Sequence, residues 1–143
     1  MPGPLDGIRI LDLSAVISGP YGTMILADQG ADVIKVEPPG RGDFTRSAGN
    51  KSGGMSASFL NNNRNKRSIT LDLKSPAGLN IVKRLAAISD VVVQNFRPGV
   101  VERLGVGEED LRKIKPDLIY VSISGFGEEG PFCDRPVYDP IVQ

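Results

Sequence analysis

Short apolar runs alternate with amphipathic stretches along this chain. Residues 8–14 (IRILDLS) are short, apolar and bounded by Gly7 and Gly19, which is typical of a buried strand. Residues 32–37 (DVIKVE), ended by Pro38 and Pro39, predict a second strand. Residues 20–29, between them, have a helical pattern, with Pro20 at a suitable first position and Gly30 as the stop. This part of the chain therefore predicts a strand–helix–strand unit.

The same alternation returns after residue 67. Residues 68–73 (SITLDL) predict a strand, and a helix should then extend to about residue 89, with Ser75 as its N-cap and Pro76 as its first residue. Strands that alternate with helices and are apolar on both faces predict an α/β fold with a mostly parallel sheet, covered by helices on both faces. The remaining predicted elements are strands at 90–96 and 117–124 and short helices at 100–104 and 108–114.

In an open parallel sheet, ligands bind beyond the carboxyl ends of the strands. The loops that leave those ends are therefore the first place to look for a site. They begin at Ser14, Glu37, Leu73, Phe96 and Ser124.

The charge of the chain is zero in total but uneven in distribution. Residues 38–67, called the basic segment below, hold six basic residues and one acid, Asp43, so this segment carries +5 and the remainder, with 11 bases and 16 acids, carries −5. The segment is rich in Gly, Ser and Asn and has no evident helical or strand period. Two interpretations stay open: a solvated basic loop, or a loop that faces an anionic ligand.

Composition removes several classes of protein. The 143 residues suit one soluble domain, and no apolar stretch is long enough to span a membrane. Without histidine, the chain cannot supply a Ser-His-Asp site or a His-ligated metal. One cysteine, Cys133, forms no internal disulfide, and the first residues lack the basic region of a signal peptide. We therefore expect a cytoplasmic protein.

Three local motifs give weak signals. The turn at 18–22, with Glu37 as the last residue of the second strand, suggests dinucleotide binding, but it reads G-x-x-G and Pro20 removes an N–H. Residues 64–67 (RNKR) resemble a nucleic-acid patch but lack interleaved aromatic residues. Tyr138-Asp139, flanked by prolines, is either a capped turn or a carboxylate that positions or activates a substrate.

Taken together, several blocks resemble the family III CoA-transferases, which include formyl-CoA transferase, carnitine CoA-transferase and, with altered chemistry, alpha-methylacyl-CoA racemase. The resemblance extends from about residue 5 to residue 143. It is carried by residues 30–37 with Gly42-Asp43, by 63–73, by 95–99 with 103–105, by 122–127 with 130–131, and by Tyr138-Asp139.

The resemblance implies an enzyme that moves coenzyme A from an acyl-CoA to a free carboxylic acid. In the family, an aspartate attacks the thioester to form a mixed anhydride, the CoA thiolate returns to form an enzyme thioester, and the acceptor carboxylate takes the CoA. No metal or redox cofactor, nucleic acid or membrane is implied. The implied fold is a Rossmann-like large domain, of which residues 1–143 would be the N-terminal part, in a homodimer.

The resemblance also implies where CoA lies. Lys74, Arg97 and Arg103 would pair with its phosphates, because hydrogen bonds from cations to phosphate are charge-assisted, and the basic segment would have the same ligand. Tyr138 and Asp139 would support the pocket. The implied contacts are Ile17, Ser18, Leu71, Asp72, Leu73, Lys74, Asn95, Phe96, Arg97, Arg103, Pro136, Val137, Tyr138 and Asp139.

Three departures from the family pattern shape the prediction. The nucleophilic aspartate is expected beyond Gln143, so we expect the 143 residues alone to be inactive. Tyr138 stands where the racemase branch has a histidine, which favours a transferase, and Ile17 stands where formyl-CoA transferase has a glutamine, which argues against oxalate as acceptor. A racemase-like member and a stand-alone nucleotide-binding module stay open as alternatives.

Overall fold

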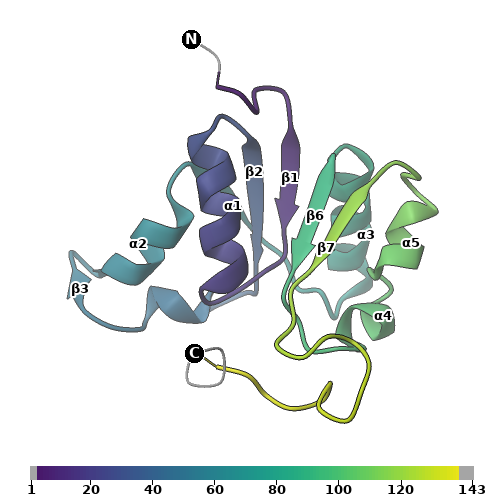
Figure 1. Cartoon of the computed structure of the whole chain (residues 1–143). Coiled ribbons are helices and arrows are strands. Elements are labelled where there is room, and N and C mark those ends of the chain that lie inside the picture. Colours follow the sequence, from purple (N-terminus) through teal and green to yellow (C-terminus); the bar gives the residue numbers. More distant parts are fainter. Residues whose placement is uncertain (1–2, 139–143) are drawn as a thin grey trace.

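The computed structural model describes residues 3–138, in which a five-stranded parallel sheet forms the centre of the fold (Figure 1). The strand order is β5-β2-β1-β6-β7, so the chain starts in the middle of the sheet and extends it first to one side and then to the other. The predicted α/β class and parallel sheet are confirmed. The strands are β1 (Arg9–Asp12), β2 (Asp32–Glu37), β5 (Lys66–Thr70), β6 (Val91–Gln94) and β7 (Ile119–Ser122).

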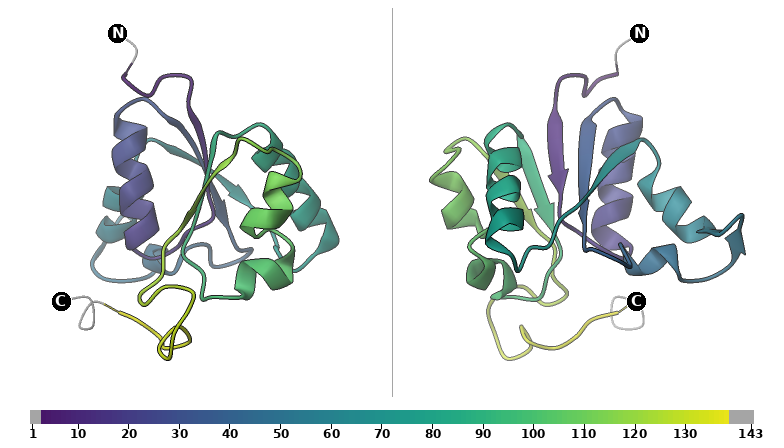
Figure 2. Two further views of the ribbon diagram at one scale, coloured as in Figure 1. Left: turned by 45° about the vertical axis from the view of Figure 1, so that its right-hand side comes forward. Right: turned by 180° about the vertical axis from the view of Figure 1, so that it is seen from behind.

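Helices cover both faces of the sheet, as predicted (Figure 2). Neighbouring residues of one strand point to opposite faces. Ile10 of β1 therefore packs with Ala27 of helix α1, whereas Leu11 packs with Val82 of helix α3 and Leu111 of helix α5. Burial on both faces explains why the central strands read as continuous apolar runs. The helices are α1 (Ser18–Asp28), α3 (Pro76–Ala87), α4 (Val100–Leu104) and α5 (Glu108–Arg112).

Several predicted boundaries differ from the structure, among them those of α1 and β5. Helix α1 begins at Ser18, so Pro20 is inside its first turn rather than at its first position. Strand β5 pairs with β2 from Lys66 to Thr70, instead of covering 68–73, and the backbone N–H of Leu71 makes a last bond to Glu37. The chain turns directly afterwards, and the predicted Ser75 N-cap of α3 is confirmed, its hydroxyl accepting a hydrogen bond from the N–H of Gly78.

The basic segment is not the featureless loop that its composition predicts. It folds back on itself through a short hairpin and a helix that packs beside α1. Ser56 caps this helix, and the guanidinium of Arg46 lies 3.8 Å from the centre of the Phe59 ring. These elements are too short to produce a readable period. They are the 3₁₀ helix η1 (Phe44–Arg46), strands β3 (Lys51–Ser52) and β4 (Met55–Ser56), and helix α2 (Ala57–Asn63).

Gly78 in α3 and Gly22 in α1 should respond to alanine with opposite changes in the free energy of unfolding. A Cβ at Gly78 would lie 2.0 Å from the carbonyl oxygen of Asp72, whereas one at Gly22 would meet nothing within 4 Å. Gly78→Ala should destabilise the chain by about 1–3 kcal/mol through overpacking. Gly22→Ala should stabilise it by roughly 0.5–1 kcal/mol, because alanine is the better helix former. Urea unfolding of the two variants would check both signs, and equal effects would contradict the close packing of α3.

The residues after β7 cross below the carboxyl ends of the strands (yellow in Figures 1 and 2), while the segment that leads into β1 lies at the opposite edge of the sheet. Loops from separate strands and this segment therefore gather at one edge. Among the helices of the described chain, none has the length and apolarity to cross a bilayer.

Candidate functional site

Two loops that leave the carboxyl edge of the sheet are joined by one side chain. The amide nitrogen of Asn95, after β6, donates to the carbonyl of Ala15 (2.8 Å) and to the hydroxyl of Ser18 (3.2 Å), while its oxygen accepts from the N–H of Ala15 (2.9 Å). The side-chain amide of Asn95 thus pairs with both backbone groups of Ala15, as a neighbouring strand would. The structure brings together Ser18 and Asn95, which the resemblance placed in the same site.

Three cations project from this edge with no acidic partner among residues 3–138. They are Lys74, which precedes α3, Arg97, which follows β6, and Arg103 on α4, and all three are exposed. A Cβ at Gly99 would lie 2.9 Å from Nη1 of Arg103, so a glycine there leaves room for the guanidinium. These three side chains are available to an anion.

The loop after β5 is a tight turn built on Asp72. The Asp72 carboxylate accepts from the N–H of Lys74 (2.9 Å), and its carbonyl accepts from the hydroxyl of Ser75 (2.9 Å). Leu71 is buried in the core on the α3 face, with Leu73 packed against that core. Leu71 therefore anchors the loop, and Lys74 is its exposed cation.

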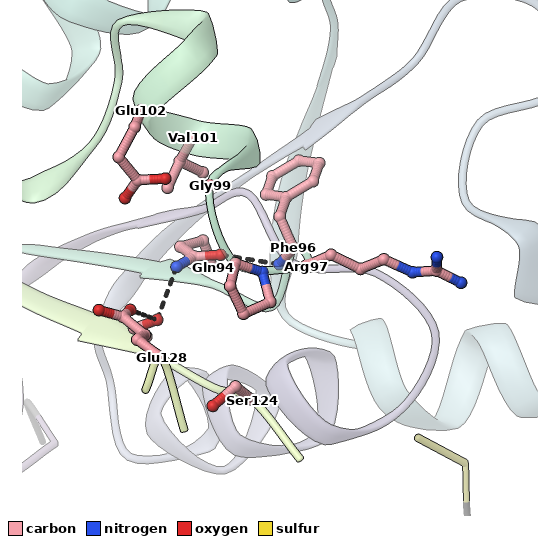
Figure 3. A pocket seen from close by; sticks show the side chains of 10 residues that line it. Gln94, Phe96, Arg97, Gly99, Val101, Glu102, Ser124 and Glu128 are labelled. Carbon is pink, nitrogen blue, oxygen red and sulfur yellow. Dashed lines mark hydrogen bonds between the residues drawn. The ribbon is translucent and has the colours of Figure 1, made fainter. Parts of the chain in front are cut away.

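A small pocket lies between the loops after β6 and β7 (Figure 3). Gln94 organises it, donating to the hydroxyl of Ser122 (2.8 Å) and accepting from the N–H of Phe96 (2.7 Å), while Ser122 donates to Glu128 (2.8 Å). The Arg97 guanidinium extends away from Gln94 and Glu128. The volume of this pocket is only about 10 Å³, far below the roughly 300–1,000 Å³ that drug-sized ligands need, so a larger ligand would lie across the edge.

Sequence reasoning missed Gln94, although a signal was present. A polar residue ends the apolar run VVVQ, and its side chain is only 3% exposed. Buried amides need hydrogen-bond partners, and such partners are found where loops converge.

Among the predicted contacts near the end of the chain, Pro136 and Tyr138 are exposed, and Asp139 lies outside the described residues. No contact with a ligand is tested by this structure, so the predicted set stays a prediction.

Beneath the β1–α1 turn lies a buried ionic cluster of Asp12, Lys35, Asp43 and Lys66. The Lys35 ammonium is 2.9 Å from the Asp43 carboxylate, and the Lys66 ammonium is 3.0 Å from that of Asp12, with all four side chains at most 2% exposed. Burial lowers the pKa of Lys66, although Asp12 opposes the change. Each buried side-chain polar atom within residues 3–138 has a hydrogen-bond partner.

The basic segment uses most of its positive charge within the protein. Four of its six cations form ion pairs with acids of the sheet and of α1, so the expectation that the segment faces an anionic ligand is wrong for these four. The suggested nucleic-acid patch at 64–67 is engaged in the same way. Their acidic partners all lie outside the basic segment, in the part of the chain that carries a net charge of −5. The pairs are Arg46–Glu37, Arg64–Asp28, Lys66–Asp12 and Arg67–Asp32.

Glu37, the acidic residue of the dinucleotide interpretation, is already engaged within the protein. Its carboxylate accepts from Arg46 through both oxygens (2.6 Å each), from the hydroxyl of Ser68 (2.6 Å) and from the N–H of Asp43 (2.9 Å). Burial by itself would raise the pKa of Glu37, but these bonds outweigh it and lower the pKa to about 2. A carboxylate engaged in this way is not free to bind a ribose hydroxyl.

The model of the CoA-transferase family III matches residues 5–143. The chain belongs to this family. Among curated relatives, it is 52% identical over 140 residues to a mouse succinyl-CoA:glutarate CoA-transferase (97% of this chain, 32% of the relative). It is 50% identical over 141 residues to an acetyl-CoA:oxalate CoA-transferase of Acetobacter aceti (99% and 36%).

Two solved structures agree with this chain in fold. A CAIB/BAIF family protein from Brucella suis superposes with a TM-score of 0.93 at 43% identity, over 99% of this chain and 38% of that one. A hypothetical protein from Mycobacterium tuberculosis gives 0.89 at 43% identity, over 96% and 38%. The chain spans about a third of the length of the first curated relatives.

Proposed function

We propose that this chain supplies the coenzyme A-binding part of a CoA-transferase, with acyl-CoA and a free carboxylic acid as substrates. The family supports the reaction class, and several relatives, including those from mouse and Acetobacter aceti, are named as CoA-transferases. Residues 1–143 would be the N-terminal part of a Rossmann-like large domain. The chemistry would use a carboxylate nucleophile and no metal or redox cofactor.

The observation that carries the proposal is the set of unpaired cations at the carboxyl edge. Nine of the 17 lysines and arginines have an acidic partner among the described residues. Lys74, Arg97 and Arg103 do not. They come from the loop after β5, the loop after β6 and the helix α4 that follows this second loop, at the edge where a parallel sheet binds ligands. CoA carries phosphate groups at its nucleotide end, and charge-assisted bonds from these cations suit them.

Isothermal titration of the chain with free CoA, and separately with NAD, tests the proposal. We expect binding of CoA and weaker or no binding of NAD, because the Glu37 carboxylate is already engaged by Arg46, Ser68 and Asp43. A preference for NAD would overturn the assignment in favour of a stand-alone nucleotide-binding module.

Arg103→Ala should weaken CoA binding by about 1–3 kcal/mol, which is roughly 5- to 150-fold in Kd. The reason is that Arg103 has no acidic partner in the described chain and should pair with a phosphate. Arg84→Ala is the matched control, since Arg84 is an exposed arginine in the last turn of α3, which leads to the amino end of β6. Equal affinity of the two variants would remove Arg103 from the site.

For the reaction, we propose an aspartyl mixed anhydride followed by an enzyme–CoA thioester. The resemblance places the nucleophilic aspartate beyond Gln143, so the 143-residue chain should bind CoA without exchanging it. Mass spectrometry of a mixture with succinyl-CoA and a dicarboxylic acid tests this expectation. Formation of the second acyl-CoA by the purified chain would contradict it.

A further inference from the structure

The turn between β1 and α1 contains an unusual backbone conformation. Val16 has a φ of +70°, in the left-handed region that a β-branched residue rarely adopts. Asn65, the other non-glycine residue with a positive φ in the described chain, is of a type that tolerates this region. Val16 directly precedes Ile17 and Ser18, two of the predicted CoA contacts. Such a conformation persists only where surrounding contacts enforce it.

Two buried side chains hold the turn at both ends. The N–H of Val16 donates to both carboxylate oxygens of Asp43, at 3.4 and 3.3 Å. The ammonium of Lys35 binds the carbonyl of Ser14 at 2.8 Å and the carboxylate of Asp43 at 2.9 Å. The side chains of Lys35 and Asp43 are each 1% exposed. One ion pair therefore fixes both the residue before the turn and the strained residue within it.

Asp43 is itself held rigidly. It caps η1, accepting from the N–H of Thr45 (2.9 Å) and its hydroxyl (2.7 Å), and its own N–H donates to Glu37. Burial would raise the pKa of Asp43, but the bonds from Thr45 and the charge of Lys35 outweigh it and lower the pKa. A buried, fixed carboxylate cannot reach a ligand in solution, so it can act on one only through the turn.

We propose that Asp43, fixed by Lys35, is a positioning residue for coenzyme A, which holds Val16 in the left-handed conformation and so presents Ile17 and Ser18 to the ligand. This inference rests on the proposed function. It also assigns a purpose to the basic segment, whose single acid is Asp43. The segment carries that acid under the turn, while its cations tie it to the sheet and to α1.

The test compares CoA affinity in the chain, Asp43→Asn, and Val16→Gly/Asp43→Asn by isothermal titration. Asp43→Asn should weaken binding at least tenfold, because the amide has one accepting oxygen in place of two and loses the charge that pairs with Lys35. The weakened anchor then lets Val16 leave the left-handed region, and the competent turn becomes a minor population. Glycine enters that region readily, so the double variant should recover affinity to within about threefold of the original. A purely structural role of Asp43 would give no such rescue.

Asp32→Asn is the matched control. Asp32 is an acid at the amino end of β2, away from the carboxyl edge, and it is paired with Arg9 and Arg67. Asp32→Asn should therefore keep the CoA affinity of the original chain. If circular dichroism shows that Asp43→Asn does not fold, the comparison is repeated with Lys35→Met/Asp43→Asn, which leaves no unpaired buried ammonium.

The outcomes separate the two proposals. Absence of CoA binding by the unmodified chain would overturn the proposed function and, with it, the positioning of this ligand. Binding by the unmodified chain with unchanged affinity in Asp43→Asn, or a loss that Val16→Gly does not restore, would overturn only the positioning role. In the unmodified chain, slow hydrogen exchange of the Val16 amide that becomes fast in Asp43→Asn would support the anchor directly.

Discussion

Asp12→Ala is expected to destabilise the folded chain by about 3–5 kcal/mol, the cost of breaking a buried ion pair by removing one partner. Asp12 is fully buried, and its carboxylate accepts from the hydroxyl of Thr23 (2.7 Å), from the N–H and hydroxyl of Ser14, and from the ammonium of Lys66 (3.0 Å). Alanine would leave Lys66 charged in a buried site and remove an acceptor from two hydroxyl groups. Domains are stable by only about 5–15 kcal/mol, so the loss should be visible as a large fall in the urea midpoint.

Two further variants isolate the cause. Asp117→Ala removes an acid whose side chain is 78% exposed and pairs with Lys115, and surface pairs contribute at most about 1 kcal/mol. Asp12→Ala/Lys66→Met removes both buried charges and should recover part of the stability that Asp12→Ala loses. A similar fall in Asp12→Ala and Asp117→Ala, or a double variant less stable than Asp12→Ala, would contradict the buried pair.

The strands and their covering helices were predictable because they follow from periodicity. Residues 32–37 have apolar side chains on both faces, and the structure has β2 over the same six residues. The first and last residues of a strand were less predictable where hydrogen bonds to a neighbouring strand determine them. Strand β5 begins at Lys66 because it pairs with β2 in a register that no apolar pattern reveals. The same holds for α2, whose seven residues span about two turns.

The resemblance, and not the residue pattern, named Lys74, Arg97 and Arg103 as partners for phosphate. In the described chain these three side chains have no acidic partner, and their contact with a ligand stays a prediction. Charge density alone misled, because the basic segment pairs with acids far away in sequence, such as Arg67 with Asp32. Ion pairing depends on the tertiary fold, which composition does not contain. Lys35 looked like an ordinary strand residue, yet it is 1% exposed and fixes the β1–α1 turn.

The Glu37–Arg46 pair should make the chain sensitive to acid. The pKa of Glu37 is about 2 in the folded protein and about 4.3 in an unfolded chain. A carboxyl group whose pKa is lower in the folded state binds protons more readily when unfolded, so it favours folding at neutral pH. That contribution is complete above about pH 5 and disappears as the pH falls towards 2. At about 1.4 kcal/mol per pKa unit, it amounts to roughly 3 kcal/mol.

Glu37→Gln should therefore flatten the acid limb of the stability profile. At pH 7 the variant should be less stable than the original chain by about 3 kcal/mol, and the difference should shrink steadily between pH 5 and pH 2, because a glutamine does not titrate. Urea unfolding at pH 7, 5, 4, 3 and 2 measures this convergence.

Glu109→Gln is the matched control, since Glu109 is exposed and has no ion pair in the described chain. Several other carboxyl groups with lowered pKa, including those of Asp32 and Asp43, make both proteins less stable in acid, so only the difference between the two profiles reports on Glu37. A difference that stays constant from pH 7 to pH 2 would mean that Glu37 stabilises the fold through its shape and hydrogen bonds rather than through its charge.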